Sequence, residues 1–146
     1  MMIAPLDSDQ LEALAAIEKS DGDAGWSRAQ FEKELSGEFR RFFVAVESPS
    51  PEILGYGGYW KAGPEAQITN LVVRKEFRCR GIGKRLLEFI LDCARSETCD
   101  ICTLEVRQSN QHAQSLYKNL GFKTKATRAK IYQNPVEDAI LMEKQL

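Results

Sequence analysis

The stretch from Ile68 to Gly83 constrains the fold and the chemistry of this chain more than any other. An apolar, β-branched run, Ile68 to Val73, precedes a basic turn, Arg78 to Gly83, which opens an amphipathic helix. Two glycines, Gly81 and Gly83, let the backbone curl closely, so that several N–H groups can point at one spot. The helix N-terminus adds partial positive charge and unpaired donors. The segment therefore predicts a strand–loop–helix unit that binds an anion, and a pyrophosphate fits it best.

The spacing within the turn disfavours two common nucleotide loops. A Walker A loop needs Gly-x-x-x-x-Gly-Lys-Ser/Thr, whereas here Gly83-Lys84 is followed by Arg85, and Arg78 stands at the first glycine position. A dinucleotide fingerprint needs three glycines and an acidic residue about 20 positions further on, and the turn has too few glycines. The alternative for this loop alone is a helix that simply begins at a glycine turn.

The composition is typical of one globular domain. The 146 residues are 43% apolar and 28% charged, enough for a proper core. The net charge of −1 gives no overall field for nucleic acid, and the basic character at 74–85 is local. There is no apolar run of about 18 residues and no secretory signal before Asp7. We expect a single domain over 1–146 that is cytoplasmic and binds neither a membrane nor nucleic acid directly.

Four cysteines raise the question of a metal or redox site. Cys99 and Cys102 have Cys-x-x-Cys spacing, but no second pair or histidine cluster completes a zinc site, and the one histidine is His112. We expect reduced thiols packed near a strand, and no metal.

Hydrophobic periodicity and turn residues predict the order β-α-α-β-β-β-α-β-α-β-β. Ser8 and Ser27 are the expected N-caps of helices at 10–19 and 28–35. Glycines 55, 57 and 58 within one strand suggest a bulge or a close approach to its face. The other expected elements are helices at 82–95 and 111–120, strands at 2–6, 42–47, 53–61, 67–73, 102–106, 122–132 and 139–144, and a turn at 48–51. The fold class is mixed α/β, a mixed sheet with helices on both faces.

Several blocks together resemble the GNAT acetyltransferases. The turn fits Arg/Gln-x-x-Gly-x-Gly/Ala, the coenzyme A pyrophosphate loop of that family. The other blocks are Leu104-Glu105-Val106-Arg107-Gln108-Ser109-Asn110, Leu116 to Phe122, Tyr132, Glu137 to Met142, Trp26-Ser27, Phe31 and Glu34-Leu35. They resemble in particular the RimI-type protein N-terminal acetyltransferases, and the likeness covers nearly the whole chain.

The resemblance implies a GNAT fold, mostly antiparallel, whose cofactor strand splays from its parallel neighbour. It implies acetyl-CoA as donor and, as acceptor, a protein N-terminus, most specifically the N-terminal alanine of a small-subunit ribosomal protein. By resemblance the cofactor contacts are the backbone of Leu71, Val72 and Val73, the loop residues Arg78, Cys79, Arg80, Gly81, Ile82, Gly83 and Lys84, and Asn110. Because no cysteine has a histidine partner, we expect direct transfer in a ternary complex.

Two side chains are the candidate acid and base. Glu105 ends an apolar strand, where partial burial suits a general base, and the alternative is a surface carboxylate paired with Arg107. A phenol such as Tyr117, with an ordinary pKa of about 10, can protonate a thiolate of about 8.5 at little cost. The resemblance makes Tyr117 the general acid, and the alternative is a core aromatic. Asn110 is well placed to cap the helix that carries Tyr117.

The acceptor is less constrained. An α-amine has an ordinary pKa of about 7.7–8.0 and lysine about 10.4, so a modest base suits an N-terminus better. By resemblance Tyr132 lies where the family closes over the peptide, but Ile131 replaces a frequent second tyrosine. Trp26 is a further candidate for the acceptor groove or for the core. A GNAT enzyme acting on lysine or a small amine, and a non-catalytic acetyl-CoA sensor, remain alternatives, and the oligomeric state stays open.

Overall fold

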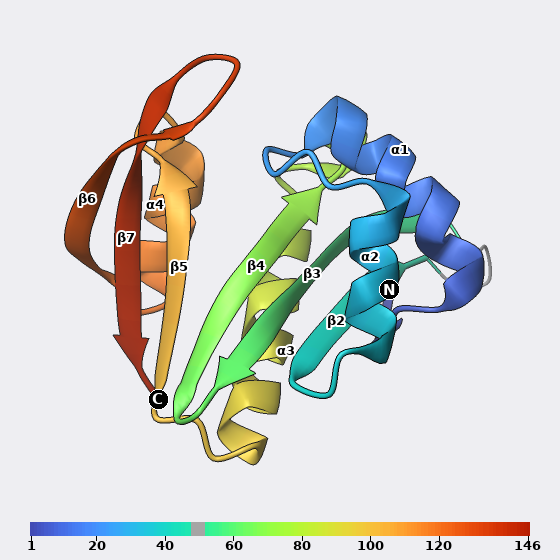
Figure 1. Cartoon of the computed structure of the whole chain (residues 1–146), viewed down its shortest axis with the longest axis horizontal. Helices are drawn as coiled ribbons and strands as arrows, with labels where there is room; N and C mark the ends of the chain where they lie inside the picture. Colours follow the sequence, from blue (N-terminus) through green and yellow to red (C-terminus); the bar gives the residue numbers. More distant parts are fainter. Residues whose placement is uncertain (48–51) are drawn as a thin grey trace.

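The computed structural model describes residues 1–47 and 52–146, which form one mixed sheet with helices on both faces (Figure 1). The sheet order is β1-β2-β3-β4-β5-β7-β6. The strands are β1 (Met2–Pro5), β2 (Arg40–Val46), β3 (Ile53–Ala62), β4 (Glu65–Val73), β5 (Ile101–Arg107), β6 (Lys123–Tyr132) and β7 (Glu137–Gln145). All neighbouring pairs are antiparallel except β4 and β5, which are parallel. The predicted fold class and element order are confirmed, and the turn expected at 48–51 lies outside the described residues.

Two helices cover each face of the sheet (Figure 1). Helices α1 (Leu11–Asp21) and α2 (Arg28–Ser36) lie over the β2–β4 side. Helices α3 (Ile82–Ser96) and α4 (Gln111–Asn119) lie on the opposite face. Short 3₁₀ turns, Ser8–Gln10 and Lys75–Phe77, precede α1 and α3. Each face therefore has its own apolar core.

Helix starts follow the capping chemistry expected from short polar side chains, with one difference. Ser27 caps α2 as predicted: it accepts from the Gln30 amide, and the Gln30 side chain accepts from the Ser27 amide at 2.8 Å. The predicted cap at Ser8 is wrong. Asp7 takes that place, accepting from the Asp9 amide at 3.1 Å, because a 3₁₀ turn begins at Ser8, two residues before the expected start of the helix.

The glycines of β3 permit a close contact with β4. A side-chain carbon on Gly55 would lie 2.6 Å from the Val72 carbonyl oxygen, too near for any residue with a Cβ. The register with β4 shifts between Gly58 and Tyr59, where the extra residue is Thr69 of β4; the extra residue of β3 itself is Leu54, beside Gly55, in the ladder with β2. A bulge strengthens the local twist of the pair, and the one at Thr69 lies just after Glu65–Gln67, the residues of β4 that pair with β5.

The sheet divides into two arms that separate along β4 and β5. Only Glu65–Gln67 pair with Ile101–Thr103, and beyond them the two strands diverge (Figure 1). Strand β5 is held instead by β7 along its whole length, from Ile101 to Arg107. We call β1–β4 the first arm, β5–β7 the second arm, and the space between residues 68–73 and 104–107 the gap. The predicted splay of the cofactor strand is confirmed.

A buried carboxylate fixes the top of the first arm. Glu18 of α1 is 1% exposed. It accepts hydrogen bonds from the Tyr56 hydroxyl and the Asn70 amide, both at 3.0 Å, and from the backbone N–H groups of Ala24 (3.1 Å) and Gly25 (3.2 Å). One side chain thus joins α1, β3, β4 and the loop that follows α1.

We predict that Glu18→Ala lowers the free energy of unfolding by about 3 kcal/mol or more, because it leaves several buried donors unpaired. Urea denaturation followed by circular dichroism measures this. Glu12→Ala, which removes an exposed ion pair with Arg28, is the control and should change stability by about 0.5 kcal/mol or less. A Glu18→Ala protein as stable as this control would contradict the structural role.

Candidate active site

A cavity of about 950 Å³ occupies the gap. Its walls come from β4 on one side, β5 on the other, the loop before α3, one face of α4 and the loop after α1. It exists because the β4–β5 ladder stops at Gln67 and Thr103, so that no strand fills the space beyond. Such a cleft between diverging strands is a common ligand site in α/β folds.

The edge of β4 presents unpaired backbone groups to the cavity. In an antiparallel ladder, alternate residues direct N–H and C=O toward the neighbouring strand. The Arg74 amide donates to the Leu54 carbonyl at 3.0 Å, so Arg74 and, by alternation, Val72 belong to the set bonded to β3. Leu71 and Val73 therefore point their backbone groups into the gap, where the Val73 carbonyl accepts from Arg78 and the Val73 N–H and both Leu71 groups remain available. The backbone of Val72, the third predicted position, serves the β3 ladder.

The glycine turn curls at the N-terminus of α3. Gly81 precedes the helix with φ of 79°, and a Cβ there would meet no atom, so the backbone angle rather than space calls for glycine. The first N–H groups of α3, from Ile82 onward, have no carbonyl acceptor within the helix. This is the geometry of an anion site at a helix N-terminus.

Most of the predicted loop residues line the cavity, namely Arg78, Cys79, Gly81, Ile82, Gly83 and Lys84. Arg80 does not. Its guanidinium lies over the Phe77 ring, 5.6 Å from the centroid. Arg78 is already held by the first arm, since its Nε donates to the Val73 carbonyl at 3.0 Å and Nη2 to the Asp21 carbonyl at 3.3 Å.

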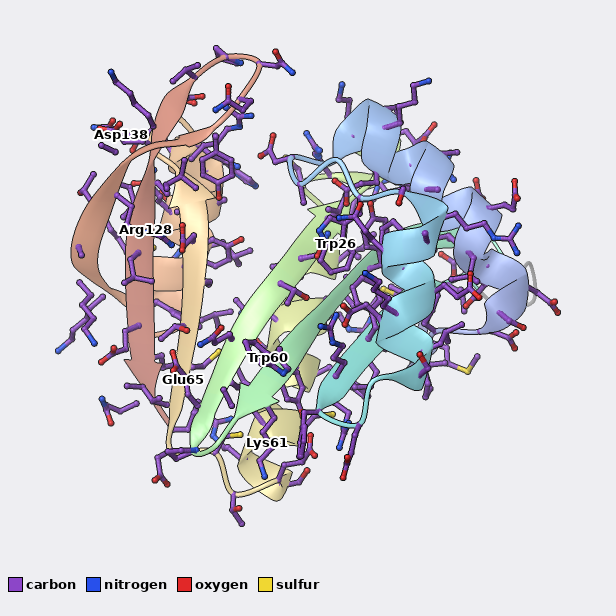
Figure 2. The ribbon with its side chains drawn as sticks, viewed as in Figure 1. Trp26, Trp60, Lys61, Glu65, Arg128 and Asp138 are labelled. Atoms are coloured by element: carbon purple, nitrogen blue, oxygen red, sulfur yellow. The ribbon has the colours of Figure 1, made fainter. Side chains whose placement is uncertain are left out.

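Glu105 lies on the β5 wall of the cavity, and its side chain is 29% exposed. Its Oε1 accepts from Nη1 of Arg128, which belongs to β6 and is labelled in Figure 2 on the second arm. The structure does not contain the ion pair between Glu105 and Arg107 that the sequence left open. The Glu105 carboxylate therefore lines the cavity and is paired with Arg128, a cation from the neighbouring β6–β7 hairpin.

Arg107 instead lies among groups from two loops, with a side chain only 10% exposed. Its partners are Asp23 Oδ1 at 3.1 Å, Glu137 Oε2 at 3.1 Å, the carbonyls of Gln133 (2.6 Å) and Pro135 (2.9 Å), and the Tyr132 ring at 4.7 Å. Sequence reasoning assigned no role of its own to Arg107 and missed Asp23 and Arg128 as site residues. The one available signal for Arg107 was its place in the Leu-Glu-Val-Arg block.

Two phenols face the same cavity. Tyr117 of α4 is 7% exposed, and burial raises its pKa well above the ordinary range, with Tyr132 and Asp23 adding to the effect. Burial likewise raises the pKa of Tyr132 to about 12, and the negative charges of Glu105 and Asp23 contribute. Both hydroxyls therefore keep their protons at neutral pH.

Asn110 and Trp26, two further predicted site residues, differ in position. Asn110 caps α4, with Oδ1 accepting from the Ala113 amide at 3.1 Å, and it also lines the cavity. Trp26 is outside the cavity lining. It is partly buried and packs against Phe31 and Phe42 at the edge of the core, with ring centroids 5.3 Å and 6.0 Å away (Figure 2). The structure therefore places Trp26 closer to the core alternative than to the cavity.

The described residues contain neither a metal-binding cluster nor a membrane-spanning helix. Within 1–47 and 52–146, no group of three or more His, Cys, Asp or Glu side chains is arranged to hold a metal ion. In the same ranges, no helix is both long and apolar enough to cross a membrane. All four cysteines are free thiols, and Cys99 and Cys102 are buried.

Comparison with known proteins agrees with this geometry. Residues 11–122 match the Acetyltransferase (GNAT) family. The chain is 29% identical over 134 residues to the putative [ribosomal protein bS18]-alanine N-acetyltransferase of Bacillus subtilis, covering 92% of this chain and 88% of that protein. It is 32% identical over 127 residues to the N-alpha-acetyltransferase RimI of Mycobacterium tuberculosis, covering 84% and 77%.

Among solved structures, the ribosomal-protein-S18-alanine N-acetyltransferase from Escherichia coli superposes with a TM-score of 0.88. The sequence identity is 28%, and the match covers 99% of this chain and 92% of that one. The resemblance found in the motifs is thereby confirmed over the length of the fold. The chain belongs to the acetyltransferase (GNAT) family.

Proposed function

We propose that this protein transfers the acetyl group of acetyl-CoA to the α-amine of an N-terminal alanine, that of ribosomal protein bS18. The observation that carries the proposal is one continuous cavity that joins a helix N-terminus suited to pyrophosphate with a carboxylate and two protonated phenols. The alanine N-acetyltransferase activity named for the B. subtilis and E. coli relatives, which match more than nine-tenths of this chain, supports the choice of acceptor.

The donor would bind along the first arm. The N–H and C=O of Leu71 and the N–H of Val73 are free to pair with the pantetheine amides, as in the addition of a strand to a sheet edge, whereas the Val73 carbonyl already accepts from Arg78. The amides at the start of α3, with Lys84 beside them, suit the pyrophosphate. An amide of β4 that points into the gap could also polarise the thioester carbonyl. Asn110 lines the same cavity from α4.

The transfer needs two proton movements. The neutral α-amine attacks the thioester carbon, an N–C bond forms, the C–S bond breaks, and the amine proton passes to Glu105. The Tyr117 hydroxyl gives its proton to the leaving thiolate. Since burial raises the pKa of Tyr117, this step is uphill by more than the roughly 2 kcal/mol that separates an ordinary phenol from a thiol, and it follows C–S cleavage. Direct attack needs no covalent acetyl-enzyme.

A small polycationic acceptor fits the cavity less well. Of the acidic residues between 21 and 38, only Asp21 and Asp23 line it, and both already have partners, Lys75 and Arg107 respectively. Glu34 is buried against Arg40. A single α-ammonium matches the few carboxylates at the cavity better than a polyamine does.

Product mass tests the function. After incubation with acetyl-CoA, a peptide that begins with alanine should gain one acetyl group, while the same peptide with a blocked N-terminus and one internal lysine should gain none. The α-amine is roughly a tenth neutral at pH 7, and lysine far less. Acetylation of the lysine alone would overturn the proposal, as would acetylation of spermidine in preference to the peptide.

The roles of acid and base have their own variants. Glu105→Gln and Tyr117→Phe should each lower kcat by about 100-fold, the contribution of one acid or base, with little change in acetyl-CoA affinity. Glu143→Gln is the matched control, because Glu143 also pairs with a cation from β6, Lys125, at 2.7 Å. The control should retain its turnover. Unchanged kcat in both variants would remove the assigned roles.

The pH profile follows from the raised pKa of Tyr117. For the peptide, kcat/KM should rise about tenfold per unit below pH 7.5, as the α-amine loses its proton, and level off near pH 8. It should then stay level to about pH 9.5, because an acid whose pKa lies above its ordinary value of 10.0 keeps its proton there. A fall between pH 8 and 9.5 would show that another group is the acid.

A further inference from the structure

Arg107 ends β5, at the point where the two arms are farthest from their shared ladder. The last paired residues of that ladder are Gln67 and Thr103, so no backbone hydrogen bond joins β4 to β5 at this end. The Arg107 guanidinium is nevertheless almost fully buried, and all three of its nitrogens donate. A buried charge needs this degree of pairing, and the partners of Arg107 show which segments it joins.

The first of its contacts reaches the first arm. Nε donates to Asp23, 84 positions earlier in the chain, in the loop 22–25 that follows α1. The same loop is held from inside by Glu18, through the amides of Ala24 and Gly25. Asp23 itself lines the cavity, and its side chain is 54% exposed. Arg107 is thus the outer anchor of a loop whose inner anchor is buried.

The remaining contacts reach the segment 132–137, which joins β6 to β7 on the second arm. Nη2 donates to the Gln133 carbonyl, Nη1 to the Pro135 carbonyl and Glu137, and the guanidinium lies over the Tyr132 ring. Glu137 in turn accepts from the Ser109 amide at 3.1 Å, which closes the network on the β5–α4 turn. A planar fork satisfies these directions at once, and an ammonium group could not.

The two segments lie on opposite sides of the gap and approach each other across its upper end (Figure 1). Each contributes a cavity-lining side chain, Asp23 from one and Tyr132 from the other. The Glu105 carboxylate lies two residues before Arg107 on the same strand face, since side chains alternate along β5. Whatever sets the distance between the two segments therefore sets the room available beside Glu105.

We propose that Arg107 is a positioning residue that fixes the width of the acceptor end of the gap by tying the loop 22–25 to the segment 132–137. Its kinetic consequence rests on the proposed function, whereas the mechanical tie rests on the contacts alone. Arg107 also lines the cavity, but all three of its nitrogens are already engaged by protein groups. It acts through Asp23 and Tyr132, and its loss loosens both segments at once.

Hydrogen exchange of the backbone amides tests the tie without any turnover. Asp23→Ala should speed exchange in peptides covering 22–25 alone, Glu137→Ala in those covering 132–137 alone, and Arg107→Ala in both, by about tenfold. Arg28→Ala, which removes an exposed ion pair with Glu12, is the control and should alter neither segment. An Arg107→Ala protein with unchanged exchange in either segment would overturn the tie.

Steady-state kinetics test the consequence. Arg107→Ala and Asp23→Ala should each raise KM for the peptide about tenfold, with acetyl-CoA KM within about twofold and kcat within about threefold. The double variant should be no worse than Arg107→Ala, because Asp23 acts through the same contact. A loss of kcat on the scale of the Glu105 variant, or an equal rise in both KM values, would overturn the positioning role.

Two further outcomes keep the tests separate. If the wild-type protein acetylates no peptide, the proposed function fails while the exchange experiment still decides the tie. If Arg107→Ala does not fold, Asp23→Ala decides, because that side chain is half exposed and its loss leaves the buried core intact. Exchange unchanged at 22–25 in Asp23→Ala would then overturn the proposal.

Discussion

The interrupted pairing between β4 and β5 is the constraint on which the rest of this structure depends. Two parallel strands that share only Glu65–Gln67 and Ile101–Thr103 leave unsatisfied backbone groups at a depth where a sheet would ordinarily continue. Those backbone groups can form hydrogen bonds with a ligand whose own amides take the place of the missing strand. The cavity, its exposed β4 edge and the helix N-terminus beside it all follow from this one interruption.

Keeping the gap open requires that each arm be stable without the other. The second arm is a ladder of β5 on β7 and β7 on β6, and the first is held by the antiparallel ladders that join β1, β2, β3 and β4. At the upper end of the gap, buried charged side chains hold the arms in place. Glu18 holds the loop 22–25 against the first arm, and Arg107 connects that loop to the second. Ion pairs suit the upper end of the gap because they can join the two arms there, whereas packed apolar side chains would fill the space that the ligand needs.

Local features of this fold could be predicted from the sequence, because short-range chemistry determines them. The Ser27 cap and the glycine turn before α3 each depend on residues that are neighbours in the chain. The cap of the first helix was missed by one position, since Asp7 and Ser8 are both good caps and only the 3₁₀ start favours Asp7.

The partners of the charged site residues could not be predicted in the same way. Glu105 meets Arg128, 23 positions away, and Arg107 meets Asp23, 84 positions away. Nothing in the spacing of Leu-Glu-Val-Arg distinguishes these partners from a pairing of Glu105 with Arg107, because alternation puts both side chains on one face of β5. Trp26 was equally undecided, since an aromatic beside Phe31 and Phe42 suits a core as well as a groove.

The most direct test of the central claim is residue-resolved amide exchange by NMR with and without acetyl-CoA. If the cofactor replaces the missing strand, protection should rise at Leu71 or Val73 and at the first amides of α3. It should not change at Val72, whose backbone already serves the β3 ladder. Protection at Val72 alone, or saturating cofactor with no change along β4, would contradict the account.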